Sequence, residues 1–266
     1  MKVGFIGGGN MGEAMLSAML AKGLASGADV MVSDVAPARR EYLAKKHGVG
    51  VTSDNREALQ WGDVVILAVK PQQLNEVMVG LSGGLKAEQL VLSIIAGVRM
   101  ETLRGGLNHS RIVRVMPNTP AQVGEGMSVW VAAPEVSGEQ QARAASILGV
   151  MGKEIRIDDE QYIDMATAVS GSGPAYIFLL AEAMIAAAEH LGFSPEVAHE
   201  LVLQTVFGSA SFMLQSDKTP AELRKMVTSP GGTTAAALAC LEQGQFNELM
   251  KQAIKAACDR AKELGA

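Results

Sequence analysis

Short apolar runs alternate with stretches of helical periodicity along the first 158 residues, and this alternation restricts the fold more than any other feature of the sequence. The runs are continuously apolar, which is typical of strands buried on both faces of a sheet. Helical periodicity follows at residues 11–21, at residues 37–47 and after Pro71. We therefore expect a parallel sheet covered by helices on both faces. The predicted strands span residues 2–6, 30–33, 64–69, 90–95, 112–116 and, as the last strand, 127–131.

From residue 159 to residue 266 only helical periodicity remains. The predicted helices span residues 162–168, 174–191, 195–215, 220–226, 233–242 and 246–264. Segments such as "AEAMIAAAEHLG" are small and apolar on nearly every side, so we expect them to pack against a partner subunit. The predicted fold is an α/β Rossmann-like N-terminal domain, residues 1–158, followed by an all-α C-terminal dimerisation domain, residues 159–266.

Composition excludes several classes of protein. Lys and Arg number 23 against 28 Asp and Glu, so no basic field exists to bind nucleic acid. Cys240 and Cys258 are too few for a disulfide framework, and each is expected as a small core residue of an alanine-rich helix. The apolar tract of residues 174–188 is interrupted by Glu182, and the first apolar run reaches glycines too early for a signal peptide. We expect a cytoplasmic protein without a membrane partner.

The first predicted strand ends in "GFIGGGNMG", which places Gly7, Gly9 and Gly12 in the GxGxxG spacing. The first glycine permits a tight turn, the second lets the backbone approach a pyrophosphate, and the third lets helix and strand pack closely. The N–H groups that open the following helix add an anion site. A glycine-rich turn without a ligand is the alternative, but the strand and helix on either side favour dinucleotide binding.

The end of the second predicted strand leaves the choice of cofactor open. Asp34 lies at the distance from the glycines where an acid usually accepts a hydrogen bond from the ribose, which favours NADH. Ser33 and the neighbouring Arg39 and Arg40 are suited to a 2′-phosphate, which favours NADPH, although the two arginines fit a solvated helix face equally well. We expect NADPH, with NADH as the alternative.

Other strand ends should also reach the cofactor, because ligands of open α/β sheets bind at the carboxyl ends of the strands. In "AVKPQ" the Lys is either an acid for the reaction or a neighbour of a phosphate, and "MPNTP" is either a wall of the nicotinamide site or a plain loop. The residues expected near the cofactor at these strand ends are Ala68, Val69, Lys70, Pro71, Ala96, Gly97 and Asn118.

The stretch "VTSPGGTTAAAL" at residues 227–238 has hydroxyls and glycines but no ionisable side chain. A carbonyl substrate gains negative charge as hydride arrives and needs a positioned acid. A protonated imine is instead neutralised by hydride, so hydroxyls and backbone amides suffice. Taken alone, the stretch fits an ordinary helix cap and turn better, although hydroxyls and N–H groups at a helix start also suit an anion.

The motifs "GFIGGGNMG", "SDNREAL", "LAVKPQ", "SIIAG", "RVMPNTP", "VSGSGPAY" and "VTSPGGTTAAAL" follow one another along nearly the whole chain. In this the chain resembles the pyrroline-5-carboxylate reductases. The resemblance implies reduction of 1-pyrroline-5-carboxylate to L-proline with NADPH or NADH, the final step of proline biosynthesis, by a homodimer or larger homo-oligomer that assembles through its C-terminal domain.

The resemblance also implies roles for individual positions. It places the pyrophosphate at Gly7, Gly9, Asn10, Met11 and Gly12, and the adenosine at Ser33, Asp34 and Asn55. It places the substrate carboxylate at Ser229, Gly232 and Thr233, and the ring nitrogen at Thr234, the expected catalytic residue. Asp34 departs from relatives that prefer NADPH, which often lack an acid at that position.

Three rival functions remain. A hydroxyacid dehydrogenase should carry a lysine early in its second domain, and residues 161–212 contain none. A reductase of another cyclic imine would use the same hydroxyls, and a regulatory protein without catalysis would be expected to have lost Thr234 or the glycines. The histidines at positions 47, 109, 190 and 199 are expected on the surface or in loops, with no catalytic role and no metal site.

Overall fold

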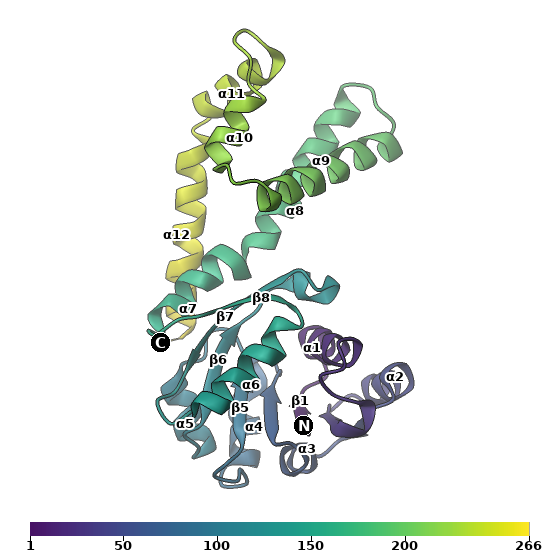
Figure 1. Cartoon of the computed structure of the whole chain (residues 1–266), viewed down its shortest axis with the longest axis vertical. Coiled ribbons are helices and arrows are strands. Elements are labelled where there is room, and N and C mark those ends of the chain that lie inside the picture. The colour runs from purple at the N-terminus through teal and green to yellow at the C-terminus, as the bar shows by residue number, and fades with distance from the viewer. Residues whose placement is uncertain (266) are drawn as a thin grey trace. The chain divides into compact units, whose positions relative to one another are not determined.

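The structure, a computed structural model, describes residues 1–265 and divides into two compact units (Figure 1). We call residues 1–172, together with the end of the chain from Ala257, the sheet unit, and Gly173–Ala256 the helical unit. The predicted domain boundary at residues 158 and 159 lies before the division at Ser172, because residues 159–172 pack with the sheet unit. Position 266, the predicted end of the second domain, lies outside the described residues.

The sheet unit contains one eight-stranded sheet in the order β3-β2-β1-β4-β5-β6-β7-β8. The first six strands are parallel and have the strand order of a dinucleotide-binding fold, so the α/β prediction is confirmed. The strands are β1 (Val3–Ile6), β2 (Val30–Ser33), β3 (Gly50–Thr52), β4 (Val64–Leu67), β5 (Leu90–Ser93), β6 (Ile112–Met116), β7 (Gly126–Ala132) and β8 (Gly152–Arg156).

Two expectations about the sheet are wrong. β7 runs antiparallel to β6, because the short connection through the 3₁₀ helix η3 (Thr119–Val123) turns the chain straight back. The predicted last strand is also followed by β8, which pairs in parallel with β7. β8 is largely charged and lies at the edge of the sheet, so its sequence carries no apolar run.

Helices cover both faces of the sheet (Figure 1). On one face α1 contacts α6 and is joined to α2 by ion pairs, and on the other α3, α4 and α5 lie side by side. The helices of this unit are α1 (Asn10–Ala21), α2 (Pro37–His47), α3 (Asn55–Trp61), α4 (Leu74–Leu81), α5 (Met100–Leu107), α6 (Gly138–Gly149) and α7 (Gln161–Ala166). The expected helix at Pro71 begins as the 3₁₀ helix η2 (Pro71–Gln73), and α7 continues into a π-helical turn, Thr167–Gly171.

Apolar strands and the inner faces of these helices form a continuous core from Val3 to Ile163. Central strands such as β1 and β4 are buried at every residue, as their continuous apolar sequences predict. Burying such side chains contributes about 1.5–3 kcal/mol each, which makes this unit stable through its own packing.

The helical unit comprises α8 (Gly173–His190), α9 (Pro195–Gln215), α10 (Pro220–Met226), α11 (Thr233–Gln243) and most of α12 (Phe246–Leu264), whose last residues belong to the sheet unit. α8 packs against α9, but apolar side chains on both helices remain exposed, including Phe178 at 59% and Phe207 at 68%. The expectation of core cysteines is wrong for the single chain, because Cys240 is exposed and Cys258 only half-buried.

By length and composition alone, two segments of the described residues are apolar enough to cross a membrane, Gln161–His190 with a mean hydropathy of 1.3 and Pro195–Gln215 with 1.2. Little of either segment is buried, 6% and 11% respectively. These helices therefore expose an apolar surface that a single chain does not cover.

Candidate functional site

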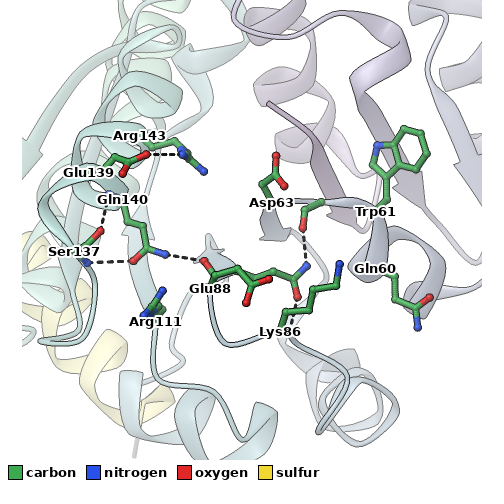
Figure 2. A pocket seen from close by; sticks show the side chains of 12 residues that line it. Gln60, Trp61, Asp63, Lys86, Glu88, Arg111, Ser137, Glu139, Gln140 and Arg143 are labelled. Carbon is green, nitrogen blue, oxygen red and sulfur yellow. Dashed lines mark hydrogen bonds and ion pairs between the residues drawn. The ribbon is translucent and has the colours of Figure 1, made fainter.

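The sheet unit has a hollow at the amino ends of its parallel strands, here called the amino edge, and another at their carboxyl ends, here called the carboxyl edge. At the amino edge, where the chain enters β4, β5 and β6, lies a hollow of about 420 Å³, and Figure 2 shows its polar lining. Its two buried amides serve the fold: Gln89 donates to the carbonyl oxygens of Leu59 at 2.7 Å and Gly62 at 2.6 Å, and Gln140 donates to that of Glu88 at 2.9 Å. The side chains of this hollow hold neighbouring loops together. Ligands of open α/β sheets bind at the carboxyl ends of the strands, on the opposite side.

The carboxyl-edge cleft, of about 730 Å³, lies where the strand order reverses between β1 and β4. Open α/β sheets bind their ligands at this point. It collects residues that follow β1, β2, β3 and β4, the start of α3, and residues along α4 as far as Gly80. Its lining comprises Gly7, Gly9, Ser33, Asp34, Val35, Ser53, Asp54, Asn55, Arg56, Ala68, Val69, Lys70, Gln73, Glu76, Val77, Val79 and Gly80.

The glycines after β1 shape one wall of this cleft. Gly7 has a φ of +99°, and a Cβ there would lie 2.7 Å from the carbonyl oxygen of Ala68. A Cβ on Gly12 would lie 2.7 Å from the carbonyl oxygen of Gly7, so the fold requires both glycines. A Cβ on Gly9 would meet no atom of the described residues within 4 Å, so the open space beside Gly9 is not needed by their packing.

α1 begins at this wall without a side-chain cap at Gly9. The N–H groups of its first turn, which include those of Asn10 and Met11, therefore remain available to an anion. Open space beside Gly9 and uncapped amides next to it are what a pyrophosphate needs. The residues present thus fit a dinucleotide.

Ser33, Asp34 and Asn55 meet at the end of the cleft beyond β2. Ser33 is 0% exposed, and its hydroxyl donates to Asn55 Oδ1 at 2.6 Å. Asp34 accepts hydrogen bonds from the N–H groups of Gly8 and Ala36, both at 2.9 Å. The carboxylate of Asp34 therefore fixes the loop after β2 against the glycine loop.

The arginines proposed from the sequence for a 2′-phosphate have other partners. Arg39 pairs with Glu13 at 2.5 Å and donates to the carbonyl oxygen of Gly8, while Arg40 donates to the carbonyl oxygen of Asp34 at 2.7 Å. Neither of them lines the cleft. The arginine that does line it is Arg56, which sequence analysis missed.

Glu13 is the centre of this ion cluster. Burial raises its pKa, but hydrogen bonds from His47, Lys46, Arg39 and Tyr42 outweigh burial and lower the pKa to about 2. Because Glu13 lies on α1 and its partners lie on α2, the cluster fixes these two helices to each other.

The remaining cofactor residues predicted from the sequence divide into two groups. Ala68, Val69 and Lys70 line the cleft after β4, whereas Asn10, Met11, Gly12, Pro71, Ala96, Gly97 and Asn118 are not part of its lining. Gly97 adopts a φ of +71° beside Leu264, near the end of α12.

Asn118 forms a bridge within the sheet unit. Its Nδ2 donates to the carbonyl oxygen of Ser170 at 3.1 Å, and its Oδ1 accepts from the N–H of Met127 at 2.8 Å. Ser170 belongs to the π-helical turn after α7, where "VSGSGP" lies. Asn118 thus connects the loop after β6 to the segment that leads into α8.

The hydroxyl-rich stretch of the helical unit forms the loop before α11. Gly231 has a φ of +68° and Gly232 precedes the first turn of α11, which no described side chain caps. The Ser229 hydroxyl lies against Gly232, since a Cβ on Gly232 would be 2.4 Å from it. Ser229 and Thr233 are exposed and Thr234 is half-buried, so this loop presents hydroxyls at a helix N-terminus, which favours an anion.

Of the histidines expected on the surface or in loops, His47 instead ends α2, whereas His109 does lie in the loop between α5 and β6 but is buried there. His47 is nearly buried and hydrogen-bonded to Glu13, and His109 is buried with Nε2 2.9 Å from the carbonyl oxygen of Gln89. Burial lowers the pKa of His109. Across the part of the chain that the structure describes, no three His, Cys, Asp or Glu side chains group as metal ligands.

Comparison with known proteins identifies close relatives. A family model described as pyrroline-5-carboxylate reductase dimerisation matches residues 160–264, and one described as NADP oxidoreductase, coenzyme F420-dependent, matches residues 2–97. A pyrroline-5-carboxylate reductase of Pseudomonas aeruginosa is 43% identical over 264 residues, which cover 99% of this chain and 96% of the relative.

Solved structures agree with these matches. A pyrroline-5-carboxylate reductase from Coxiella burnetii is 40% identical with a TM-score of 0.90, over 100% of this chain and 98% of that one. The pyrroline carboxylate reductase of Plasmodium falciparum, solved with NADP bound, is 32% identical with a TM-score of 0.90 over the same shares.

Proposed function

Because the chain belongs to the pyrroline-5-carboxylate reductase family, we propose that its carboxyl-edge cleft holds the nicotinamide cofactor and that the loop before α11 holds the substrate. The enzyme is an NAD(P)H-dependent oxidoreductase that reduces 1-pyrroline-5-carboxylate to L-proline, the final step of proline biosynthesis. The observation that carries the cofactor assignment is the open space beside Gly9 at an uncapped helix start.

Residues in the cleft and next to it bind different parts of the cofactor. The N–H groups of Asn10, Met11 and Gly12 hold the pyrophosphate, and Ser33, Asp34 and Asn55 hold the adenosine ribose. Ala68, Val69, Lys70 and Pro71 lie toward the nicotinamide, together with Ala96, Gly97 and Asn118. The fixed hydrogen bonds of Ser33 and Asp34 support this assignment, because a preorganised wall loses little entropy on binding.

The bound cofactor supplies a hydride. Ser229, Gly232 and Thr233 hold the substrate carboxylate at the start of α11, where backbone N–H groups and the helix dipole favour an anion. Thr234 accepts a hydrogen bond from the protonated ring nitrogen and so orients the imine carbon. Hydride addition neutralises the iminium cation, and the nitrogen needs no proton from the protein in that step. Orientation of this kind supplies much of the rate enhancement.

The match of residues 160–264 to a dimerisation model indicates homo-oligomerisation. The exposed apolar side chains of α8 and α9 support a homodimer, or a larger assembly of dimers, formed through these helices. On this proposal a second copy covers the apolar segments, so the protein is soluble without detergent; we propose a cytoplasmic location. Nucleic acid has no part in its function, since the net charge is −5.

The test is the initial rate of NADPH and of NADH oxidation with 1-pyrroline-5-carboxylate, followed by absorbance. Two further substrates sharpen it: 1-pyrroline, which lacks the carboxylate, should be reduced far more slowly, and a 2-keto acid should not be reduced. Equal rates with and without the carboxylate would contradict the substrate loop. Fast reduction of the keto acid would favour the hydroxyacid dehydrogenase.

Gly9→Ala and Gly7→Ala form a matched pair for the cofactor site. Gly9→Ala should leave the thermal unfolding midpoint unchanged and weaken dinucleotide binding, because the added methyl meets only open space that the pyrophosphate would occupy. Gly7→Ala should lower the unfolding midpoint, because its methyl meets the backbone of Ala68. Unchanged dinucleotide affinity in Gly9→Ala would remove this loop from the site.

A further inference from the structure

One cation, Arg56, lies at the end of the carboxyl-edge cleft beyond β2 and has not yet been assigned a part in binding. Arg56 lies in the first turn of α3, next to Asn55, and lines the cleft. Its Nε donates to the carbonyl oxygen of Gly80 at 2.8 Å, which fixes the direction of the guanidinium. Within residues 1–265 Arg56 has no ion pair, so its two terminal nitrogens can still donate to an anion.

The neighbouring arginines are committed elsewhere. Arg39 bonds to Glu13 and to the carbonyl oxygen of Gly8, and Arg40 bonds to the carbonyl oxygens of Asp34 and Val35. The cleft's other cation, Lys70, follows β4 on the side expected for nicotinamide. Of the cations that line the cleft, Arg56 is therefore the one placed to bind a phosphate on the adenosine ribose.

Two of the three acids that line the cleft, Asp34 and Asp54, accept backbone N–H groups. Both carboxylate oxygens of Asp34 accept backbone N–H groups, and Asp54 Oδ1 caps α3 by accepting from the N–H of Arg56 at 2.8 Å. Hydrogen bonds of this kind to backbone donors reduce the charge that each carboxylate presents to a ligand. Glu76 on α4 also lines the cleft, so acids outnumber cations in its lining. A phosphate bound there therefore needs a cation close to it.

We propose that Arg56 determines cofactor specificity by binding the 2′-phosphate of NADPH beside Ser33 and Asn55. This inference rests on the proposed cofactor cleft. Arginine suits the role because its planar guanidinium forms paired, charge-assisted hydrogen bonds with phosphate oxygens. The 2′-phosphate distinguishes NADPH from NADH, so Arg56 offsets the preference for NADH that an acid at Asp34 would otherwise impose.

Calorimetric titration of the full-length protein tests the proposal without turnover. The ligands are NADP⁺ with NAD⁺, and 2′,5′-ADP with 5′-AMP, two pairs that differ only in the 2′-phosphate. Arg56→Ala should weaken NADP⁺ and 2′,5′-ADP about tenfold or more, the usual effect of losing a charged hydrogen bond, and change NAD⁺ and 5′-AMP less than about twofold. Arg56→Gln, which keeps a donor for Gly80, should give the same selective loss.

Controls separate this role from its rivals. Arg143→Ala, in the amino-edge hollow, should change neither affinity, and thermal unfolding should show that each variant is folded. An unchanged ratio of NADP⁺ to NAD⁺ affinity in both Arg56 variants would overturn the proposal, as would equal weakening of both, or a selective loss in Arg40→Ala in place of Arg56→Ala. Wild-type protein that binds neither dinucleotide would overturn the cofactor cleft itself, which is a different failure.

Discussion

The two units of this chain differ in the burial of their apolar side chains. In the sheet unit Phe5 is 1% exposed at the centre of a continuous core, whereas in the helical unit Phe178 and Phe207 are more than half exposed. The sheet unit therefore obtains its stability from its own packing. The helical unit has an apolar surface that only another surface can bury, so its stability and its assembly are one property.

The largest effect should come from placing a charge on the exposed apolar surface of α9, which should weaken dimer formation. Phe207→Asp puts a charge where two copies are proposed to meet, and burial of one phenylalanine in each copy contributes about 3–6 kcal/mol per dimer. The dimer dissociation constant should rise about a hundredfold or more, with loss of activity at working concentration. Sedimentation measures the association.

The control for that change is Val123→Asp. Val123 is 78% exposed and lies in the sheet unit, so its substitution should leave the dissociation constant unaltered. If Phe207→Asp stays dimeric, or if Val123→Asp dissociates, the assignment of the interface to α9 is wrong.

The next effect concerns the sheet unit alone. Arg114 on β6 is 2% exposed and pairs with Glu160 at 2.7 Å and Asp164 at 3.2 Å, which connects α7 to the sheet. Arg114→Ala would leave two carboxylates without their cation and should lower the free energy of unfolding by about 3–5 kcal/mol. Urea denaturation measures this.

Arg143→Ala is the matched change at the surface. It removes the pair with the exposed Glu139 and should cost less than about 1 kcal/mol. Similar losses in the two variants would show that burial of the Arg114 pairs contributes nothing special to the sheet unit.

Acid should weaken the sheet unit through Glu13. The pKa of Glu13 is lowered from 4.5 to about 2, so its stabilising contribution is complete above pH 4.5 and is lost as pH falls from 4.5 toward 2. The full shift corresponds to on the order of 3 kcal/mol. Glu13→Gln should flatten this part of the pH dependence of unfolding. An unaltered slope would mean that the cluster between α1 and α2 does not contribute.

The smallest effect on stability should come from the loop before α11. Within residues 1–265 the Thr234 hydroxyl forms no hydrogen bond, so Thr234→Ala should leave the unfolding midpoint the same. Turnover should fall about tenfold, the usual effect of one lost hydrogen bond to a charged group, while cofactor affinity is retained. Thr234→Ser should retain most of the rate. Unchanged kinetics in Thr234→Ala would exclude this residue from the reaction.

Local patterns predict most of the elements. The bounds of β2, α2, α9 and α12 follow from the sequence directly, because apolar periodicity, Pro37 and Pro195 mark them. β3 has three residues and β8 is charged, so neither gives a pattern. The reversal between β6 and β7 follows from their short connection, which is too short for the crossover that a parallel pair needs, so the spacing of the two predicted strands already contained this signal.

The site shows the same limit. The glycine motif, the match of motifs along the chain and the hydroxyl-rich loop predict the family, the cofactor class and the activity, and the comparisons confirm these. The choice among Arg39, Arg40 and Arg56 cannot be read from the sequence, because it depends on which guanidinium already has a partner. Arg39 is excluded from binding the phosphate because it pairs with Glu13, which lies 26 residues earlier in the chain.

The edges of the sheet have a further consequence. One edge is β3, only three residues long, and the other is β8, where Lys153, Glu154 and Arg156 place charges along the strand. Neither offers a long, flat row of free backbone groups on which a foreign strand could grow. Concentrated solutions should therefore resist fibril growth through the sheet, and any precipitate that forms should retain the infrared signature of the native fold.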